Sequence, residues 1–297
     1  MSDRVIVPSG CDDDVAVVER LLVAADGYRL AAHDFAPPGA VRGYAVIAPA
    51  MGVTQRYYAP FAAWLATHGI HALTFDYRGM GRSRPASLRG FAADLTTWAR
   101  VDAGAALADV ATRAGHLPIY WIGHSLGGQV VPMIPGADRI ARLITVAGGS
   151  GYWRYASRSL RWRAPLLWYV IVPASLRIAG YFPGRTLRMV SDVPHGAMAQ
   201  WRRWCLHPDY APGAEGAAVR AEYAALRTPI LSLSFTDDEY MSAASIASLH
   251  AFYSGANRQM VRLAPADIGV ASIGHFGFFR ERFAASLWVP YVLPALD

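Results

Sequence analysis

Short apolar runs alternate with segments of helical spacing along most of the chain. The runs are four to seven residues long and nearly all apolar, as expected of strands buried on both faces of a sheet. This alternation predicts a mostly parallel sheet with helices on both faces. The expected strands are 44–50, 71–77, 119–123 and 142–147, and the expected helices are 57–68, 92–114 and one that starts at Leu126.

An antiparallel hairpin is expected before these units, because residues 15–23 and 28–35 read as strands joined by a turn at Gly27. The alternation of strands and helices returns near the end of the chain. There the expected strands are 230–235 and 260–264, and the expected helices are 242–253 and a closing one from about Phe279.

Between these two parts the alternation stops, over residues 151–225. The segment contains ten arginines against four acidic residues, and it is too long for an ordinary connection. It also holds Trp153, Trp162, Trp168, Trp201 and Trp204. We therefore expect a core made of residues 1–150 and 226–297, with residues 151–225 inserted as a cap.

The composition narrows the functional classes to which the protein can belong. The net charge is +6 and every basic residue is arginine, but the arginines are scattered and no nucleic-acid motif is present, so nucleic-acid binding is not expected. Cys11 and Cys205 are too few for a disulfide framework or a metal site. Residues 1–14 lack a signal-peptide pattern, and the most apolar stretch, residues 165–173, is too short to span a bilayer. These features predict a cytoplasmic protein.

One pentapeptide carries the pattern of an activated nucleophile, Gly123-His124-Ser125-Leu126-Gly127. In G-x-S-x-G the serine occupies the tip of a sharp strand-to-helix turn, where side chains at the flanking positions would clash. A β-rich run precedes the pentapeptide and a helix-compatible run follows it, which is the context that the motif requires. We predict that Ser125 is a nucleophile.

A serine hydroxyl is a weak nucleophile and needs a neighbouring base. When serine lies in such a turn, the acid and then the base follow it along the chain. His275 is the expected base because it lies between glycines in a loop after the last strand, whereas His250 lies within a helix. The other histidines show no metal-ligand spacing, and no metal or cofactor is expected.

The acid is expected in the loop that follows strand 230–235, because loops at the carboxyl ends of parallel strands surround the site. Three carboxylates stand in a row there, and Asp237, Asp238 and Glu239 are all candidates. A carboxylate that does not serve the histidine is expected to cap the helix that starts near Ser242.

Two backbone N–H groups are expected to hold the oxyanion that forms when a carbonyl is attacked. One belongs to Leu126, which follows the nucleophile. The other is expected from the loop after strand 44–50, where Met51 is the candidate.

Over nearly its whole length the chain resembles the α/β-hydrolase superfamily, and within it the bacterial monoacylglycerol-lipase or serine aminopeptidase group. The resemblance rests on the oxyanion loop, the late acid and histidine, residues 123–128 and residues 76–83, which match the D-x-R-G-x-G-x-S turn near the site. The family's H-G-T-D-D pattern implies that Asp238 is the acid. One departure is Pro49-Ala50, which stands where the family usually has His-Gly.

These features predict a serine hydrolase that cleaves a carboxylic ester with an apolar acyl group. Thioester or amide cleavage, acyl transfer on the same triad, and a non-catalytic binding module are the alternatives. The arginine- and tryptophan-rich cap is also compatible with docking on an anionic membrane. A solvated cap face is the favoured interpretation of that composition.

Overall fold

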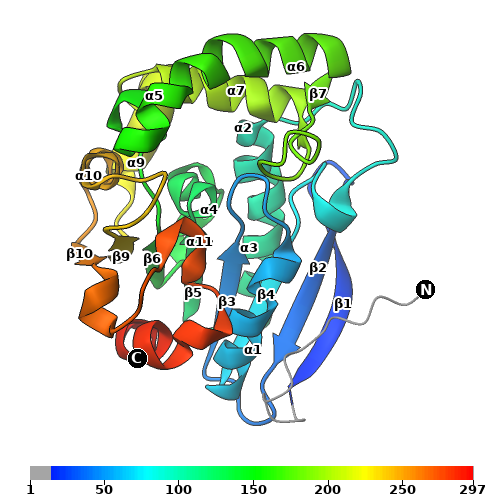
Figure 1. Ribbon diagram of the computed structural model, residues 1–297. Helices are drawn as coiled ribbons and strands as arrows, with labels where there is room; N and C mark the ends of the chain where they lie inside the picture. Colours follow the sequence, from blue (N-terminus) through cyan, green and yellow to red (C-terminus); the bar gives the residue numbers. More distant parts are fainter. Residues whose placement is uncertain (1–14, 297) are drawn as a thin grey trace.

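The computed structural model describes residues 15–296, so the acidic start and Cys11 lie outside the described residues. An eight-stranded sheet in the order β1-β2-β4-β3-β5-β6-β9-β10 forms its centre (Figure 1). β2 pairs antiparallel with β1 and β4, and the other pairs are parallel, which confirms the predicted sheet and entry hairpin. The strands are β1 (Ala16–Val23), β2 (Arg29–Ala36), β3 (Gly43–Ala48), β4 (Ile70–Phe75), β5 (Ile119–His124), β6 (Arg142–Val146), β9 (Ile230–Phe235) and β10 (Arg258–Leu263), with a separate pair β7 (Tyr181–Phe182) and β8 (Val193–Pro194).

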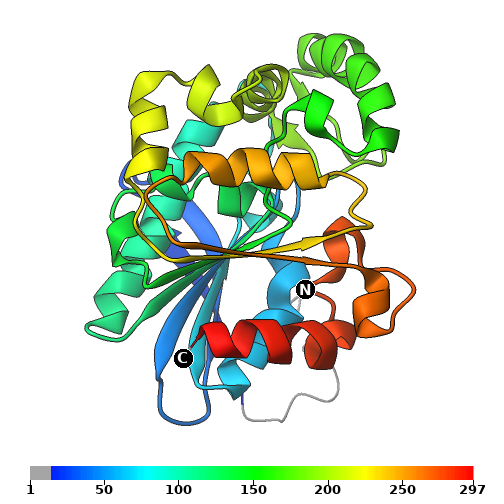
Figure 2. The ribbon, with the colours of Figure 1, turned by 90° about the vertical axis from the view of Figure 1, so that its left-hand side faces the viewer.

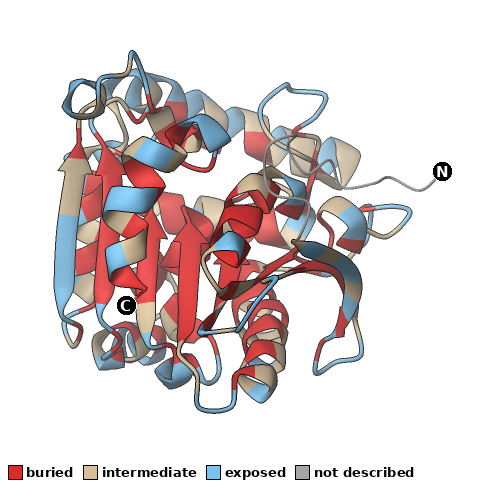
Figure 3. Cartoon of the chain, turned by 90° about the horizontal axis from the view of Figure 1, so that it is seen from below, coloured by how far each residue is buried: buried red, intermediate tan, exposed pale blue. Residues whose placement is uncertain are grey.

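Helices cover both faces of the sheet. Neighbouring side chains of each strand point to opposite faces, so Ile47 packs in one hydrophobic cluster with α1, and Val46 packs in the other with α3. The central strands are therefore buried along their length (Figure 3). The α-helices are α1 (Ala59–Thr67), α2 (Leu95–Thr97), α3 (Gly104–Ala114), α4 (Leu126–Gln129), α5 (Arg158–Leu166), α6 (Val172–Ala179), α7 (His195–Leu206), α8 (Tyr210–Ala214), α9 (Ala217–Ala225), α10 (Ala243–Phe252) and α11 (Gly274–Gly277).

Several helices differ from the expectation. The helix after Ser125 is only four residues long, because Pro132 has no N–H to bond the Gly128 carbonyl, which instead accepts the Tyr253 hydroxyl (3.0 Å). The segment expected as helix 92–114 starts at Leu95, with π-helical geometry over Trp98–Ala103 between α2 and α3. The closing helix starts with a 3-10 turn at Glu281–Phe283 and continues as the π-helical segment Ala284–Val292.

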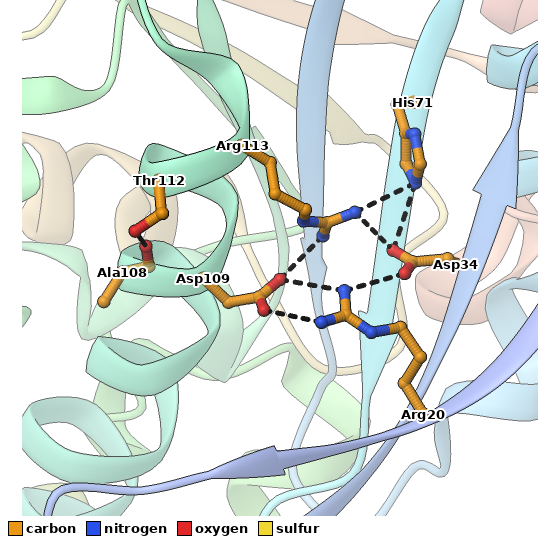
Figure 4. Close-up of polar contacts among 7 residues, drawn as sticks. All are labelled: Arg20, Asp34, His71, Ala108, Asp109, Thr112 and Arg113. Atoms are coloured by element: carbon orange, nitrogen blue, oxygen red, sulfur yellow. Dashed lines mark hydrogen bonds and ion pairs between the residues drawn. The ribbon is translucent and has the colours of Figure 1, made fainter.

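A network of ion pairs joins the entry hairpin to α3 (Figure 4). Arg20 of β1 bridges Asp34 of β2 and Asp109 of α3, each at 2.8 Å, and Arg113 contacts the same two carboxylates at 3.0 and 2.7 Å. Burial disfavours the charged form of Asp34, but hydrogen bonds from His71 and Arg20 outweigh it and hold its pKa at about 2. The network thereby fixes the edge of the sheet to the helix that covers it.

The D-x-R-G-x-G-x-S segment is a tight turn built around Asp76. The Asp76 carboxylate accepts the backbone N–H groups of Gln55 (2.8 Å) and Arg82 (3.0 Å). A Cβ on Gly81 would lie 2.2 Å from that carboxylate, so glycine is required there. The Arg78 guanidinium contacts the Asp102 carboxylate of the π-helical segment at 2.7 Å, which holds the turn against that segment.

Residues 151–225, expected to be the cap, fold as α5 to α9 with the pair β7–β8. We call this segment the cap. Its helices α5, α6 and α7 lie above the carboxyl ends of the parallel strands (Figures 1 and 2). The cap starts where β6 ends and returns to the sheet at β9, so it covers the edge at which the predicted site residues emerge.

Candidate functional site

Ser125 occupies the tip of the turn between β5 and α4. Its backbone has φ 49° and ψ −112°, a region that non-glycine residues rarely adopt, and such strain commonly costs about 1–3 kcal/mol. A Cβ on Gly123 would lie 2.3 Å from the Gly128 nitrogen, and one on Gly127 would lie 2.2 Å from the Ala48 carbonyl oxygen. Both glycines of the motif are therefore required by close backbone contacts.

Asp238 and His275 lie in contact beside this turn. Asp238 Oδ2 is 2.9 Å from His275 Nδ1, and both residues are about 5% exposed or less. The other carboxylate oxygen, Oδ1, accepts the N–H groups of Tyr240 (2.8 Å) and Met241 (2.9 Å). These bonds fix the carboxylate on both sides, so it can hold the imidazole in one orientation and one tautomer.

His275 lies on the one-turn helix α11 rather than in a loop, and the remaining carboxylates hold that helix. Asp237 accepts two N–H groups at its start (2.8 and 3.1 Å), and Glu239 accepts that of His275 (2.9 Å). The expectation that they cap α10 is wrong, because the Ser242 hydroxyl caps that helix. All three neighbouring carboxylates therefore position one residue, His275.

A chain of buried hydrogen bonds joins the loops around the site. The Ala50 N–H donates to the Tyr58 hydroxyl (2.9 Å), which lies 2.8 Å from His124 Nδ1. His124 Nε2 lies 3.0 Å from the His275 carbonyl oxygen, which can only accept, so Nε2 carries the proton and Nδ1 accepts from Tyr58. Burial, and then the proximity of His275, lower the pKa of His124 well below its ordinary value, which keeps this imidazole neutral.

The two candidate oxyanion donors come from the loop after β3 and from the start of α4. Met51 lies in a turn closed by a hydrogen bond from Val53 N–H to the Ala50 carbonyl (3.1 Å), and the Ala50 N–H is engaged by Tyr58. The hydrogen bonds among the described residues leave the N–H groups of Met51 and Leu126 without an acceptor. Both groups are thus free to bind an anionic oxygen.

Comparison with known proteins places the chain in a family. A family described as serine aminopeptidase, S33, matches residues 39–190, about half of the chain. The chain belongs to this hydrolase family. No curated protein has a sequence that matches this chain significantly.

Solved structures show the fold that the sequence predicts, the α/β-hydrolase fold. A hypothetical protein from Pseudomonas aeruginosa has 13% identity and a TM-score of 0.58 over 94% of this chain and 93% of that chain. An esterase from Pyrococcus furiosus has 12% identity and a TM-score of 0.58, over 91% and 88%. The α/β-hydrolase GrgF from Penicillium sp. sh18 has 16% identity and a TM-score of 0.55, over 95% of both chains. At these identities the similarity concerns the fold.

An apolar cavity of about 110 Å³ lies between the cap and the core. Its walls come from the inner face of α5 and α6, from α7 and from the loops after β6 and β9. Cys205 in the wall is a free thiol, and burial raises its pKa well above the ordinary value, which keeps it protonated. The largest side chains of the lining are Trp153, Trp168, Phe182, Met198, Trp201 and Tyr240.

Two walls of the cavity lie beside predicted site residues. Tyr240 lies in its wall, and its ring centroid is 4.9 Å from that of His275. On the other side Val190 lines the cavity and packs so closely on Gly52 that a Cβ at that glycine would lie 2.6 Å away. The cavity therefore extends between the acid loop and the loop of the candidate oxyanion donor.

Two residues around His275 were not predicted from the sequence, Tyr58 and His124, and only His124 lies inside a motif, G-x-S-x-G. Asp237 and Glu239 were candidates for the acid, and they hold the backbone of α11 instead. Among the described residues, no group of three or more His, Cys, Asp or Glu side chains is arranged to bind a metal ion.

Proposed function

We propose that the protein is a serine hydrolase that cleaves a carboxylic ester through an acyl-enzyme, with Ser125, His275 and Asp238 as its triad. The observation that carries this proposal is the 2.9 Å contact between His275 and Asp238, beside a serine in the strained conformation of a nucleophile turn. Membership of a hydrolase family supports the same conclusion.

In this mechanism the Ser125 hydroxyl attacks the ester carbonyl carbon while His275 Nε2 takes its proton. Asp238 stabilises the imidazolium that forms, and the N–H groups of Met51 and Leu126 hold the negative oxygen. The bond between the former carbonyl carbon and the alcohol oxygen then breaks, and His275 gives the proton to that oxygen as the alcohol leaves. Water, with His275 as its base, attacks the acyl-enzyme and releases the acid and free Ser125.

The cavity supports an apolar acyl group as the part of the substrate that is recognised. Its lining is almost entirely aromatic and aliphatic, and it adjoins both His275 and the loop that carries Met51. Each methylene that enters such a cavity adds about 0.8 kcal/mol of binding, or about fourfold in kcat/KM, until the cavity is filled. Esters of longer acyl chains should therefore react faster than acetate.

The test is hydrolysis of p-nitrophenyl esters from two to sixteen acyl carbons by wild type, Ser125→Ala and two matched carboxamide variants. Asp238→Asn should lower kcat by about 10⁴-fold, because the imidazole then takes the wrong tautomer. Asp237→Asn lies one residue away and changes the charge equally, but it touches only the backbone of α11. We expect it to lower kcat by no more than about tenfold.

Equal losses for the two carboxamide variants would contradict the role given to Asp238. If wild type fails on every ester, labelling of Ser125 with a fluorophosphonate separates the alternatives. A reactive Ser125 would direct the search to thioesters and acyl acceptors, and an unreactive one to a non-catalytic binding module.

A further inference from the structure

One helix of the cap exposes large apolar side chains to solvent. It runs without a break from α5 through a π-helical turn at Leu167–Ile171 into α6, and forms the top of the molecule (Figures 1 and 2). Trp162 is 78% exposed and Ile178 is 75% exposed. Leu166 and Tyr169 follow Trp162 by four and seven residues, so the three share one helical face, and both are more than half exposed. We call this the outer face.

The opposite face of the same helix packs against the rest of the protein. Ala164, Trp168 and Val172 are spaced by four residues, are buried, and line the apolar cavity. A helix on a protein surface needs one apolar face, and its other face is normally polar. Apolar residues on the outer face are therefore not explained by folding of the cap, and exposed patches of this kind mark binding surfaces.

The charge around the outer face has one sign. No acidic residue occurs between Asp138 and Asp192, whereas nine arginines do. Four of them lie exposed on this helix, and within residues 15–296 none of the four is in an ion pair. These four are Arg158, Arg161, Arg163 and Arg177. A cationic helix with exposed Trp, Leu and Tyr complements an anionic surface that has an apolar interior.

We propose that the outer face docks on the surface of an anionic phospholipid bilayer. Its tryptophan and leucine enter the interfacial region, and its arginines meet the lipid phosphates. The attachment is peripheral, since no helix in the described part of the chain is long and apolar enough to cross a membrane. The individual exposures and the lack of ion pairs, which the sequence could not supply, favour docking over a solvated face.

The lining of the cavity also reaches the surface of the molecule, because Met189 lines the cavity and is half exposed. A lipid ester could enter there from the bilayer. This part of the inference rests on the proposed function, whereas docking itself does not depend on catalysis.

The experiment is flotation of the full chain with vesicles of phosphatidylcholine alone and of phosphatidylcholine with 30% phosphatidylglycerol, at low and high salt. We expect wild type to float with the anionic vesicles and to be released by salt. Arg161→Gln with Arg163→Gln should weaken binding by about 25-fold, since each cation near such a surface contributes roughly fivefold. Trp162→Ser with Leu166→Ser should abolish flotation.

Matched controls are Val18→Ser with Val23→Ser, which are exposed apolar residues of β1, and Arg29→Gln of β2. They should float like wild type, and every variant should keep wild-type hydrolysis of a soluble short-chain ester. Using Ser125→Ala separates the two proposals, because docking should survive in it. Failure of wild type to bind anionic vesicles would overturn the inference. The inference would also be overturned if light scattering detected a dimer of wild type and the substitutions of Trp162 and Leu166 dissociated it.

Discussion

Removing the hydroxyl of Tyr58 should disturb three loops at once. In Tyr58→Phe the Ala50 N–H loses its acceptor and His124 Nδ1 loses its donor, and all of these groups are buried. An unsatisfied buried polar group costs about 1–3 kcal/mol, so we expect the free energy of unfolding to fall by about 2–4 kcal/mol. The loss comes from two groups because the hydroxyl serves both of them.

Activity should fall as well, although Tyr58 is not placed in contact with substrate. The turn that carries Met51 is held at Ala50, and the His275 carbonyl is held by His124, so both lose part of their support. A displacement of about 1 Å at a reacting group can cost about 100-fold, and we expect kcat to fall by about 10- to 100-fold. KM should change little, because the cavity wall is unaltered.

The measurements are urea denaturation and the kcat and KM for p-nitrophenyl butyrate. Tyr120→Phe is the control, since its buried hydroxyl donates to the Leu296 carbonyl at the other end of the sheet (2.5 Å). It should lose stability but keep kcat. If Tyr58→Phe keeps a kcat within about twofold of wild type, the positioning role assigned to the hydrogen-bond chain is refuted.

Three further predictions concern other parts of the fold. Gly127→Ala places a Cβ 2.2 Å from the Ala48 carbonyl oxygen, and should destabilise the protein by about 1–3 kcal/mol and abolish fluorophosphonate labelling, as thermal unfolding and gel fluorescence would show. Burial lowers the pKa of His250 to about 4, so stability present above pH 6.5 should decline by about 3 kcal/mol as the pH falls to 4, and His250→Gln should flatten that part of the profile. The pKa of Asp34 is lowered to about 2, so its contribution to the free energy of unfolding should be complete above pH 4 and lost as the pH falls toward 2. After allowance for solvent screening, Asp34→Asn should lower the free energy of unfolding by about 1 kcal/mol. An unchanged acid-unfolding curve would contradict this.

The sharp turn at Ser125 was predictable from the sequence because close packing at its two glycines excludes side chains. The contacts that demand glycine at position 123 come from Gly127 and Gly128 of the same strand–turn–helix unit, whereas those at position 127 come from Ala48 of the neighbouring strand β3. The parallel sheet was predictable for a similar reason. A strand buried on both faces is a nearly continuous apolar run, and β5 and β9 are mostly apolar and buried throughout.

The lengths of some helices could not be predicted from the local apolar pattern. The residues after Ser125 are apolar enough for a longer helix, but Pro132 cannot bond the Gly128 carbonyl, and a tyrosine 125 positions away supplies the missing donor. Apolar spacing predicts which face of a helix is buried. It does not show that a distant side chain will satisfy the backbone where that helix stops.

The roles of the three neighbouring carboxylates depended on tertiary structure. Asp237, Asp238 and Glu239 are chemically alike and adjacent, and the residues alone left all three open. Only Asp238 meets the imidazole, while its two neighbours bind the backbone of α11, because a tight loop directs successive side chains to different partners.

The sequence by itself determined the fold class, the sharp turn at Ser125 and the set of groups from which a triad is proposed, because these follow from local geometry and from the apolarity that burial requires. The tertiary structure alone joined Tyr58 to His124 over 66 positions and His124 to His275 over 151. It alone showed that the outer face of the cap helix, which carries Trp162, is open to solvent. Packing of distant segments decides both, since whether an apolar side chain is buried depends on what the rest of the chain places against it.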